Sequence, residues 1–315
     1  MEIKNIGIDR VEEISHQFNC TFFTNPIVLK RVFKSIDWWA AVKGQEVICI
    51  WPVPLDTMGI PDQSLPFTYY VGPIWKTPLP DDPPHRATKL TNEVYSNFLE
   101  IFSRVYPGIR ASLSPTLVDI RPFTWWRKPG FKLTTNIKYT AQLRVEPLEA
   151  MSRKFRQVKR WELKHVPTSK FTISYNLNNE REVVDFYKTL PFHSEAVQED
   201  PNLIPILQCY LRLSPREGCH SISIHESATG KLAAFALLGE HANTFNVLVS
   251  CSNNQDYPNC YLSTYLNVLI FSLSIERGAH LIDFNGANGV RLADSKHSFG
   301  ALPKIYFEIE IAREK

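Results

Sequence analysis

The sequence predicts an α+β protein made of two domains with mixed, mainly antiparallel sheets. Its 315 residues, 44% of them hydrophobic, suit two domains of roughly 150 residues each. Along the second half, runs of neighbouring strands are interrupted by helices at uneven intervals, which favours α+β over a regularly alternating α/β fold. We place the domains at residues 1–138 and 139–315, with the last strand as a candidate to return to the first domain.

Turn residues and hydrophobic periodicity predict the elements of the first domain. WWAAVKGQEVICIWPVPL indicates a hairpin that turns at Lys43-Gly44, and the alternation over Val47–Val53 is typical of a half-buried strand. The proline-rich residues 54–85 predict a long loop, in which FTYYVGPIW could form a short strand. Helical spacing predicts a helix over 87–106, and strand pieces follow in ASLSP, LVDIRPFTWW and KPGFKL.

The second domain is expected to begin with the strand YTAQLRV at 139–145, followed by one helix over Pro147–His165. The remaining elements are predicted from period-2 and period-3.6 patterns. In chain order they are the strand TISYNL, the helices REVVDFYKTL and LIPILQCYLRL, the strands HSISIHE, KLAAFALLGEH and TFNVLVSC, the helix YLSTYLNVLIFSLSIERG, and the strands HLIDFNG and KIYFEIEI.

Charge and cysteine usage narrow the functional classes. The net charge of +3 does not indicate a DNA-binding protein. The six cysteines form no C-x-x-C pair, and the N-terminal MEIKNIGIDR is charged rather than signal-like, so we expect reduced thiols and a cytoplasmic location. The longest apolar run, around Tyr265–Ile275, is too short and too polar to span a membrane.

A series of motifs resembles the FemAB/FemX-like acyltransferase superfamily. The strand Tyr139–Val145 leads into Ser152-Arg153-Lys154-Phe155-Arg156, and HLIDFNGANG, SKHSFGA and KIYFEI follow. The resemblance implies two GNAT-like domains, that is, domains with the acyl-CoA N-acyltransferase fold. It also implies an N-acyltransferase or aminoacyltransferase that has no tightly bound cofactor and uses acyl-CoA or aminoacyl-tRNA as co-substrate. The implied acceptor is an amine of an amino sugar, of a nucleotide-linked cell-envelope precursor or of a small molecule.

One stretch departs from the pattern of acyl-CoA users, which place glycines in the turn where backbone N–H groups bind the pyrophosphate at a helix N-terminus. The corresponding stretch here, NNQDYPNCYLST, contains no glycine. Acyl-CoA and charged tRNA therefore both stay open as donors. A second hypothesis also stays open, in which the fold is retained without catalysis as a binding module for a phosphorylated glycan or RNA.

The predicted helix over Pro147–His165 would place four cations within an arc of about 80°: Arg153, Arg156, Arg160 and Lys164. Glu162 is the only acid in residues 152–165. The resemblance puts ligands here, so the cations are predicted to bind phosphate of a nucleotide-activated acceptor or of a tRNA backbone. An ordinary solvated helix face is the alternative.

The resemblance assigns Lys296, in the turn DSKHSFG, to stabilising the tetrahedral oxyanion of acyl transfer. The alternative is a turn lysine before a core phenylalanine. His297 is a candidate general base or a solvent-facing residue, and Phe299 is a candidate for substrate binding. Asp283 and Asn285 are expected on one face of a strand. Asp283 could orient or deprotonate the acceptor amine, or it could cap the following turn, and Asn285 is a candidate substrate ligand.

Weaker candidates complete the predicted site. Tyr69 and Tyr70, in the proline-rich loop, could line the acceptor cleft. His193 and Glu195 lie in PFHSEAVQEDP, a region that faces the active site in acetyltransferase folds. No Ser-His-Asp order and no metal-ligand spacing is seen, so we expect neither a covalent enzyme intermediate nor a metal site.

Overall fold

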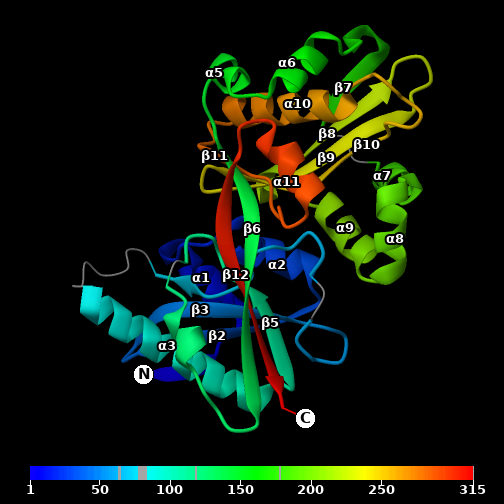
Figure 1. Ribbon diagram of the computed structural model, residues 1–315. Helices are drawn as coiled ribbons and strands as arrows, with labels where there is room; N and C mark the ends of the chain where they lie inside the picture. The colour runs from blue at the N-terminus through cyan, green and yellow to red at the C-terminus, as the bar shows by residue number, and fades with distance from the viewer. Residues whose placement is uncertain (63–64, 77–83, 118, 177–178, 315) are drawn as a thin grey trace. The chain divides into compact units, whose positions relative to one another are not determined.

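The structure is a computed structural model that describes residues 1–62, 65–76, 84–117, 119–176 and 179–314. The chain divides into two compact units (Figure 1). Unit 1 consists of Met1–Lys138 together with Ile305–Lys315, and unit 2 consists of Tyr139–Lys304. The long strands β6 (Phe131–Arg144) and β12 (Leu302–Arg313) contribute residues to both units.

Unit 1 contains an antiparallel sheet in the order β1-β2-β3-β4. A further strand, β5, pairs antiparallel with β12 from Glu308↔Ser112 to Ala312↔Gly108. The elements in chain order are β1 (Glu2–Asn5), α1 (Ile8–Ile14), α2 (Pro26–Val32), β2 (Ser35–Lys43), β3 (Glu46–Leu55), β4 (Ile74–Trp75), α3 (Pro84–Val105), β5 (Gly108–Ser112) and α4 (Arg121–Trp125).

Unit 2 contains a sheet in the order β6-β11-β10-β9-β8-β7, with β10 and β11 parallel and the other pairs of this series antiparallel. The mixed, mainly antiparallel sheets of the prediction are therefore confirmed. The elements after β6 are α5 (Leu148–Arg153), α6 (Gln157–Lys164), β7 (Phe171–Tyr175), α7 (Glu180–Thr189), α8 (Pro191–Glu199), α9 (Leu203–Leu211), β8 (Cys219–Glu226), β9 (Leu232–His241), β10 (Thr244–Ser252), α10 (Leu262–Glu276), β11 (Leu281–Asp283) and α11 (Val290–His297).

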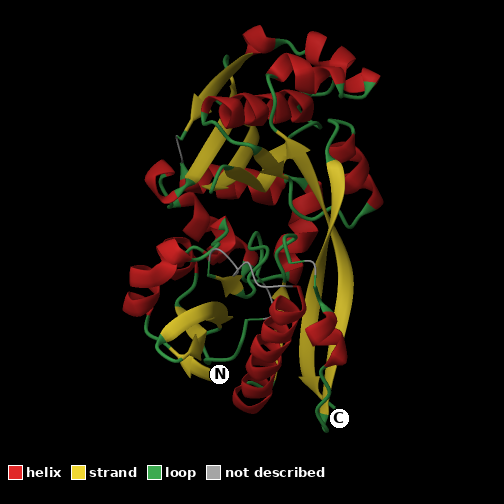
Figure 2. Cartoon of the chain, turned by 90° about the vertical axis from the view of Figure 1, so that its left-hand side faces the viewer, coloured by secondary structure: helices red, strands yellow, loops and turns green. Residues whose placement is uncertain are grey.

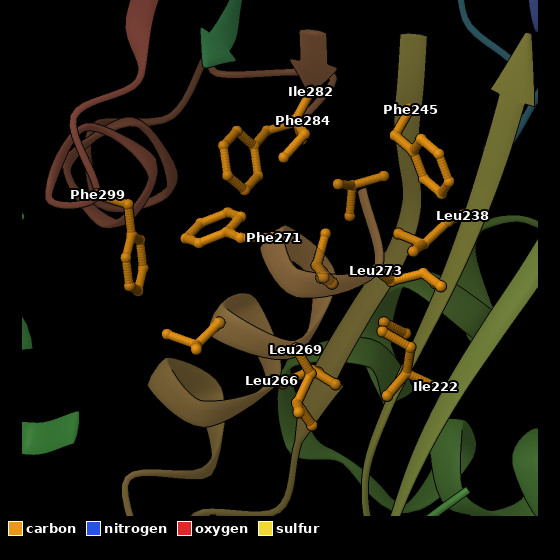
Figure 3. Close-up of a cluster of buried hydrophobic side chains, with 14 of the residues drawn as sticks. Ile222, Leu238, Phe245, Leu266, Leu269, Phe271, Leu273, Ile282, Phe284 and Phe299 are labelled. Atoms are coloured by element: carbon orange, nitrogen blue, oxygen red, sulfur yellow. The ribbon is translucent and has the colours of Figure 1, made fainter. Parts of the chain in front are cut away.

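Helices pack on the strands of each unit, as Figure 2 shows by element type. In unit 1, Trp51 of β3 lies among the rings of α3, 5.5 Å from Phe98 and 5.0 Å from Phe102 between ring centroids. In unit 2, α10 is buried along most of its length and supplies the centre of the core. Phe271 of α10 lies 5.7 Å from Phe299 and 6.1 Å from Phe284 (Figure 3).

Several local predictions are confirmed. The hairpin β2–β3 turns at Gly44, whose φ of +65° suits glycine. Beside these predicted elements, helix α2 starts at Asn25-Pro26, with the Asn25 side chain accepting a hydrogen bond from the Ile27 N–H. The strand over 139–145 forms the end of β6, and the long helix over 261–278 forms α10.

Other local predictions are wrong. Arg121–Trp125 is a short helix rather than a strand. Pro122 lies in its first turn, where backbone N–H groups form no intrahelical hydrogen bond, so the missing N–H of proline costs nothing. Strand β3 is buried from Cys49 onwards instead of half-buried, because α3 and the rest of the aromatic core cover it. The strand expected within FTYYVGPIW is limited to Ile74–Trp75. Residues 63–64 and 77–83 of the predicted proline-rich loop lie outside the described residues.

The helix predicted over Pro147–His165 is interrupted between α5 and α6. Arg156 adopts an extended conformation, and its N–H donates to the Ser298 carbonyl at 2.7 Å instead of to a helical partner. Phe155 is buried against Phe271 and Phe299. The bond to Ser298 requires the chain to leave the helical path at Arg156, and this partner is not visible in the local sequence pattern.

Candidate active site

Strands β10 and β11 separate in unit 2 and leave a gap in the sheet. They pair over three positions, from Thr244↔Leu281 to Asn246↔Asp283. Strand β11 ends there, whereas β10 continues to Ser252. Within the described chain, the part of β10 beyond Asn246 has no strand partner on this side, and its register shifts between Val247 and Val249. A gap beside the carboxyl ends of parallel strands is a favoured place for ligands.

Asn285 lies at this gap. Its Nδ2 donates to the Val247 carbonyl at 3.0 Å, and its own N–H donates to Oδ1 of Asp283 at 2.8 Å. The residue is 1% exposed, and its Oδ1 has no hydrogen-bond partner in the described part of the chain. Because Asn285 has a φ of +51° and follows the end of β11, the strand alternation that predicted a shared face with Asp283 does not extend to it.

Asp283 is enclosed in unit 2, with a residue exposure of 2%. Thr140 donates to its Oδ1 at 2.5 Å and Gln142 donates to its Oδ2 at 2.8 Å, so the carboxylate links β6 to β11. Burial raises the pKa of Asp283 above its usual value, and these donors oppose the shift. In this conformation, burial keeps Asp283 from contacting an acceptor amine directly. Its hydrogen bond from the Asn285 N–H agrees with the alternative role, in which Asp283 caps the turn after β11.

Lys296 lies in the last turn of α11, and not in a turn as the sequence suggested. Its Nζ donates to the carbonyl oxygens of Phe284 (3.0 Å), Asn285 and Gly286 (2.6 Å). An ammonium group has three N–H donors, so all of them are engaged. Burial lowers the pKa of Lys296 to about 8, and the nearby Asp283 charge opposes this shift. The lysine therefore fastens the loop after β11 to α11.

The two neighbours of Lys296 in the predicted motif have protein partners. His297 is half-buried, and its Nδ1 lies 2.7 Å from the Ala301 carbonyl oxygen. Phe299 is 1% exposed and packs edge-on against Phe155 and Phe271. In this conformation the core of unit 2 encloses the ring of Phe299, and contact of this residue with substrate stays a prediction.

The four cations of the predicted basic face are not aligned on one helix. Arg153 is exposed on α5, where it forms an ion pair with Glu149 at 2.5 Å. Arg156 lies between the helices and forms two hydrogen bonds with Asp294 of α11, at 3.0 and 2.5 Å. Arg160 donates to the carbonyl oxygens of Arg153 and Phe155, both at 3.0 Å, and so caps the end of α5. Lys164 lies exposed at the end of α6.

Acids outside the counted stretch 152–165 balance this surface. Glu146 pairs with Lys154 at 2.7 Å, Glu149 pairs with Arg153, and Asp294 pairs with Arg156. The pKa of Asp294 is lowered by hydrogen bonding to Arg156. Counting acids only within residues 152–165 therefore overestimated the positive charge.

A pocket of about 550 Å³ opens in unit 2 beside the end of β10. Its wall combines the start of α8, residues 252–255 and Arg291 of α11. The ionisable side chains of the wall are His193, Glu195 and Arg291. The structure thus brings together the two α8 residues that the sequence singled out, and it adds Arg291, which sequence analysis missed. The sequence feature that could have pointed to Arg291 is the loop NGANG, whose Gly289 precedes the first turn of α11.

His193 is the titratable base of this pocket. Its ring stacks on Tyr187, with ring centroids 4.2 Å apart and an interplanar angle of 23°. Burial lowers the pKa of His193 below its usual value, so the imidazole is neutral at pH 7 and able to accept a proton. Arg291 is exposed, and no ion pair of its guanidinium is found among the described residues. It is therefore available to an anionic ligand.

A second pocket, of about 300 Å³, lies in unit 1. Tyr70 lines it, as do Trp75 of β4 and Tyr95 of α3. Tyr69 is not part of this wall and packs edge-on against Phe23 at 5.7 Å. Of the two tyrosines predicted to line a cleft, the structure therefore places Tyr70 in a pocket.

The N-terminus of α10 corresponds to the stretch that departs from the acyl-CoA pattern. Glu162 of α6 accepts hydrogen bonds from Thr264, in the first turn of α10, and from Lys159 at 2.8 Å. Trp161 packs edge-on against Tyr261, the residue that precedes the helix. A carboxylate already complements the positive end of the helix, so these residues do not fit a CoA diphosphate at this position.

Comparison with solved structures shows which fold this architecture represents: it is that of tandem GNAT proteins. A crystal structure of FemX aligns over 98% of this chain and 97% of its own, with a TM-score of 0.63 and 10% identity. A tandem GNAT protein from the clavulanic acid biosynthesis pathway aligns over 99% and 98%, with a TM-score of 0.57 and 12% identity. L-PGS from Bacillus licheniformis aligns over 99% and 94%, with a TM-score of 0.53 and 8% identity.

At these identities the likeness establishes the fold, and the resemblance seen in the sequence motifs is confirmed at that level. No protein-family model and no curated protein sequence matches the chain. No described helix has the length and hydropathy needed to cross a bilayer. Within the same described residues, no group of three or more His, Cys, Asp or Glu side chains is arranged to hold a metal ion.

Proposed function

We propose that the protein transfers an acyl or aminoacyl group from a carrier to an amine, and that the reaction takes place at the pocket of unit 2. The observation that carries this proposal is a half-buried, neutral histidine and an available arginine in the wall of one pocket at the end of β10. The fold is shared over nearly the whole chain with FemX and with a tandem GNAT protein, which supports this reaction class by analogy.

The proposed general base is His193. An amine that attacks a carbonyl must lose a proton, and a neutral imidazole within the pocket can accept it. Stacking on Tyr187 restricts the orientation of the ring. Direct attack forms the new C–N bond and expels the carrier oxygen or sulfur, which takes up a proton. We therefore propose no covalent enzyme intermediate.

Arg291 is proposed to bind an anionic group of the acceptor. Its guanidinium can engage a phosphate or carboxylate with two parallel hydrogen bonds, and Glu195 stands in the same wall. An acceptor with both an amine and an acidic group suits this set of side chains. A nucleotide-linked cell-envelope precursor and a phosphorylated amino sugar both meet this description.

Lys296 is proposed to supply the cation that stabilises the tetrahedral oxyanion. For this role one of its carbonyl partners at residues 284–286 must be exchanged for the oxyanion, since all three N–H groups are engaged. In the alternative role, Lys296 only fixes the loop that leads to Arg291. The two roles differ in outcome, because loss of a purely structural lysine lowers thermal stability and substrate affinity together with turnover.

The donor is proposed to be aminoacyl-tRNA rather than acyl-CoA. The support is local: Glu162 at the first turn of α10 would repel a diphosphate there. A thermal-shift series with acetyl-CoA, longer acyl-CoAs and aminoacyl-tRNA tests this choice, because stabilisation follows ligand occupancy. We expect a raised midpoint with aminoacyl-tRNA only. A larger shift with an acyl-CoA would overturn the choice of donor but not the reaction class.

The reaction class itself is tested by product formation with the stabilising donor and a panel of amines. The panel contains amino sugars, nucleotide-linked amino sugars and small amines, and transfer is followed by mass spectrometry. His280→Gln is a matched control for His193→Gln, since His280 is an exposed histidine of unit 2 outside the pocket. Saturable binding of donor and acceptor without product from any pair would instead favour a non-catalytic binding module.

A further inference from the structure

The pocket of unit 1 takes no part in the proposed chemistry, yet it is a well-formed cavity. It lies between β4, α3 and the segments around residues 19–24 and 114–119. Its volume of about 300 Å³ is at the lower end of ligand sites in proteins, which suits a single ring-sized group.

The wall of this pocket offers hydroxyl groups and no free charge. Thr21, Thr91, Ser114 and Thr116 line it, and none of the described residues of its wall is a lysine, arginine or histidine. Its one acid, Asp119, forms an ion pair with Arg121 at 2.7 Å, and that arginine lowers the pKa of Asp119. A phosphate would find no cation in this wall, and an ammonium group would find only a carboxylate that is already paired.

Two aromatic residues add a polar and an apolar surface to the wall. Trp75 Nε1 donates to the Tyr95 hydroxyl at 2.6 Å, with the two rings edge-to-face at 5.7 Å. Tyr95 is 1% exposed, and its hydroxyl proton has no acceptor within the described residues. A ligand hydroxyl can serve as that acceptor, while the indole ring offers apolar contact to the C–H groups of a sugar.

The backbone at the pocket is strained. Tyr70 has a φ of +57°, which is an outlier for a bulky residue. Its ring is held by edge-to-face contacts with Phe23 at 5.7 Å and Tyr306 at 5.2 Å. Such strain concentrates at ligand sites, where the surrounding structure over-determines the conformation. This observation is independent of the hydroxyl composition of the wall.

We propose that the unit 1 pocket binds an uncharged, hexose-sized sugar residue. The threonine and serine hydroxyls and the Tyr95 hydroxyl form hydrogen bonds with the sugar hydroxyls, and Trp75 contacts the apolar edge of its ring. This binding does not rest on the proposed function.

Isothermal titration of the full chain with four hexoses of the same ring size tests the proposal. N-acetylglucosamine and glucose are neutral, glucosamine at pH 6 is cationic, and glucose 6-phosphate is anionic. We expect saturable binding of a neutral hexose, with affinity for each charged one at least about tenfold weaker, because the wall has no counter-charge to offset desolvation.

Thr91→Val and Thr116→Val remove one hydroxyl each at nearly constant volume, and each should weaken neutral hexose binding about three- to tenfold. Thr172→Val, on β7 of unit 2, is the matched control and should leave the affinity unchanged. Absence of saturable binding, tighter binding of glucose 6-phosphate, or equal weakening by the control would each overturn the proposal. If the protein binds a hexose but transfers no acyl or aminoacyl group, the result contradicts the proposed function and leaves the sugar site standing.

Discussion

The two units contain the same kind of pocket with different chemistry. Both contain a run of three strands, a long helix and one more strand, which is preceded by α1 and α2 in unit 1 and by α7, α8 and α9 in unit 2. In each unit the pocket is lined by the segment before the first of these strands, by the end of the third strand and by the segment after the last. The wall in unit 1 is hydroxylated and has no free charge, whereas that in unit 2 holds His193, Glu195 and Arg291. Under the two proposals, the repeated fold separates recognition of a neutral group in unit 1 from acyl transfer in unit 2.

The largest expected effect separates the two pockets through Lys296. Lys296→Met should lower kcat about 100- to 1,000-fold if the ammonium stabilises an oxyanion, while hexose binding in unit 1 stays unchanged. Steady-state kinetics and calorimetry on one preparation measure both quantities. Lys170→Met, at an exposed position, is the control. An equal loss of activity and of melting temperature, with KM raised, would assign Lys296 to fixing the loop.

The pH dependence of stability gives Lys296 a second readout. Its pKa of about 8 lies below the ordinary lysine value of 10.5, so the unfolded chain binds more protons between these values. The free energy of unfolding contributed by Lys296 should therefore rise with pH in this range. Buried Cys49 and Tyr95, whose pKa values are raised, act in the opposite direction. Denaturant titrations at pH 7.5 and at pH 10 give the difference in free energy of unfolding between wild type and Lys296→Met. The contributions of Cys49 and Tyr95 cancel in this difference. Wild type minus variant should be larger at pH 10 than at pH 7.5.

His193→Gln should lower kcat/KM about a hundredfold, since general-base catalysis contributes on this scale. In the wild type, kcat/KM should fall as the pH drops through a pKa below the usual 6.5, because burial holds the imidazole neutral above that point. The variant should lose this acidic limb, whereas His280→Gln should keep it. A pH profile that is the same in the wild type and His193→Gln would remove His193 from the mechanism.

Arg291→Ala should raise KM for an anionic acceptor about tenfold and change kcat less, because its proposed contact holds a part of the substrate that does not react. Arg291→Lys should recover part of the affinity, as it keeps the charge but not the two-pronged geometry. An amine acceptor without an acidic group is the internal control. If its KM rises equally, the arginine is not the anion site.

The sequence was sufficient for features that depend on local pattern. The hairpin at Gly44, the helix α10 and the fold class follow from turn residues and periodicity. The site was less accessible, because its geometry depends on contacts between distant parts of the chain. Asp294 pairs with Arg156, and Ser298 binds the Arg156 N–H, from about 140 residues further along. Nearer in the sequence, the backbone carbonyl oxygens of residues 284–286 engage Lys296, and a pattern of side chains does not encode contacts to backbone atoms.

The smallest expected effect concerns the four cations that the sequence grouped together. Arg160 donates to two carbonyl oxygens at the end of α5, so Arg160→Met should lower the free energy of unfolding by about 1–2 kcal/mol. Arg153 forms only an exposed pair with Glu149, and Arg153→Met should cost less than about 0.5 kcal/mol. Urea titration of the two variants measures the difference. Equal and small effects would mean that Arg160 does not cap α5, and the basic face would again be a candidate for ligand binding in unit 2.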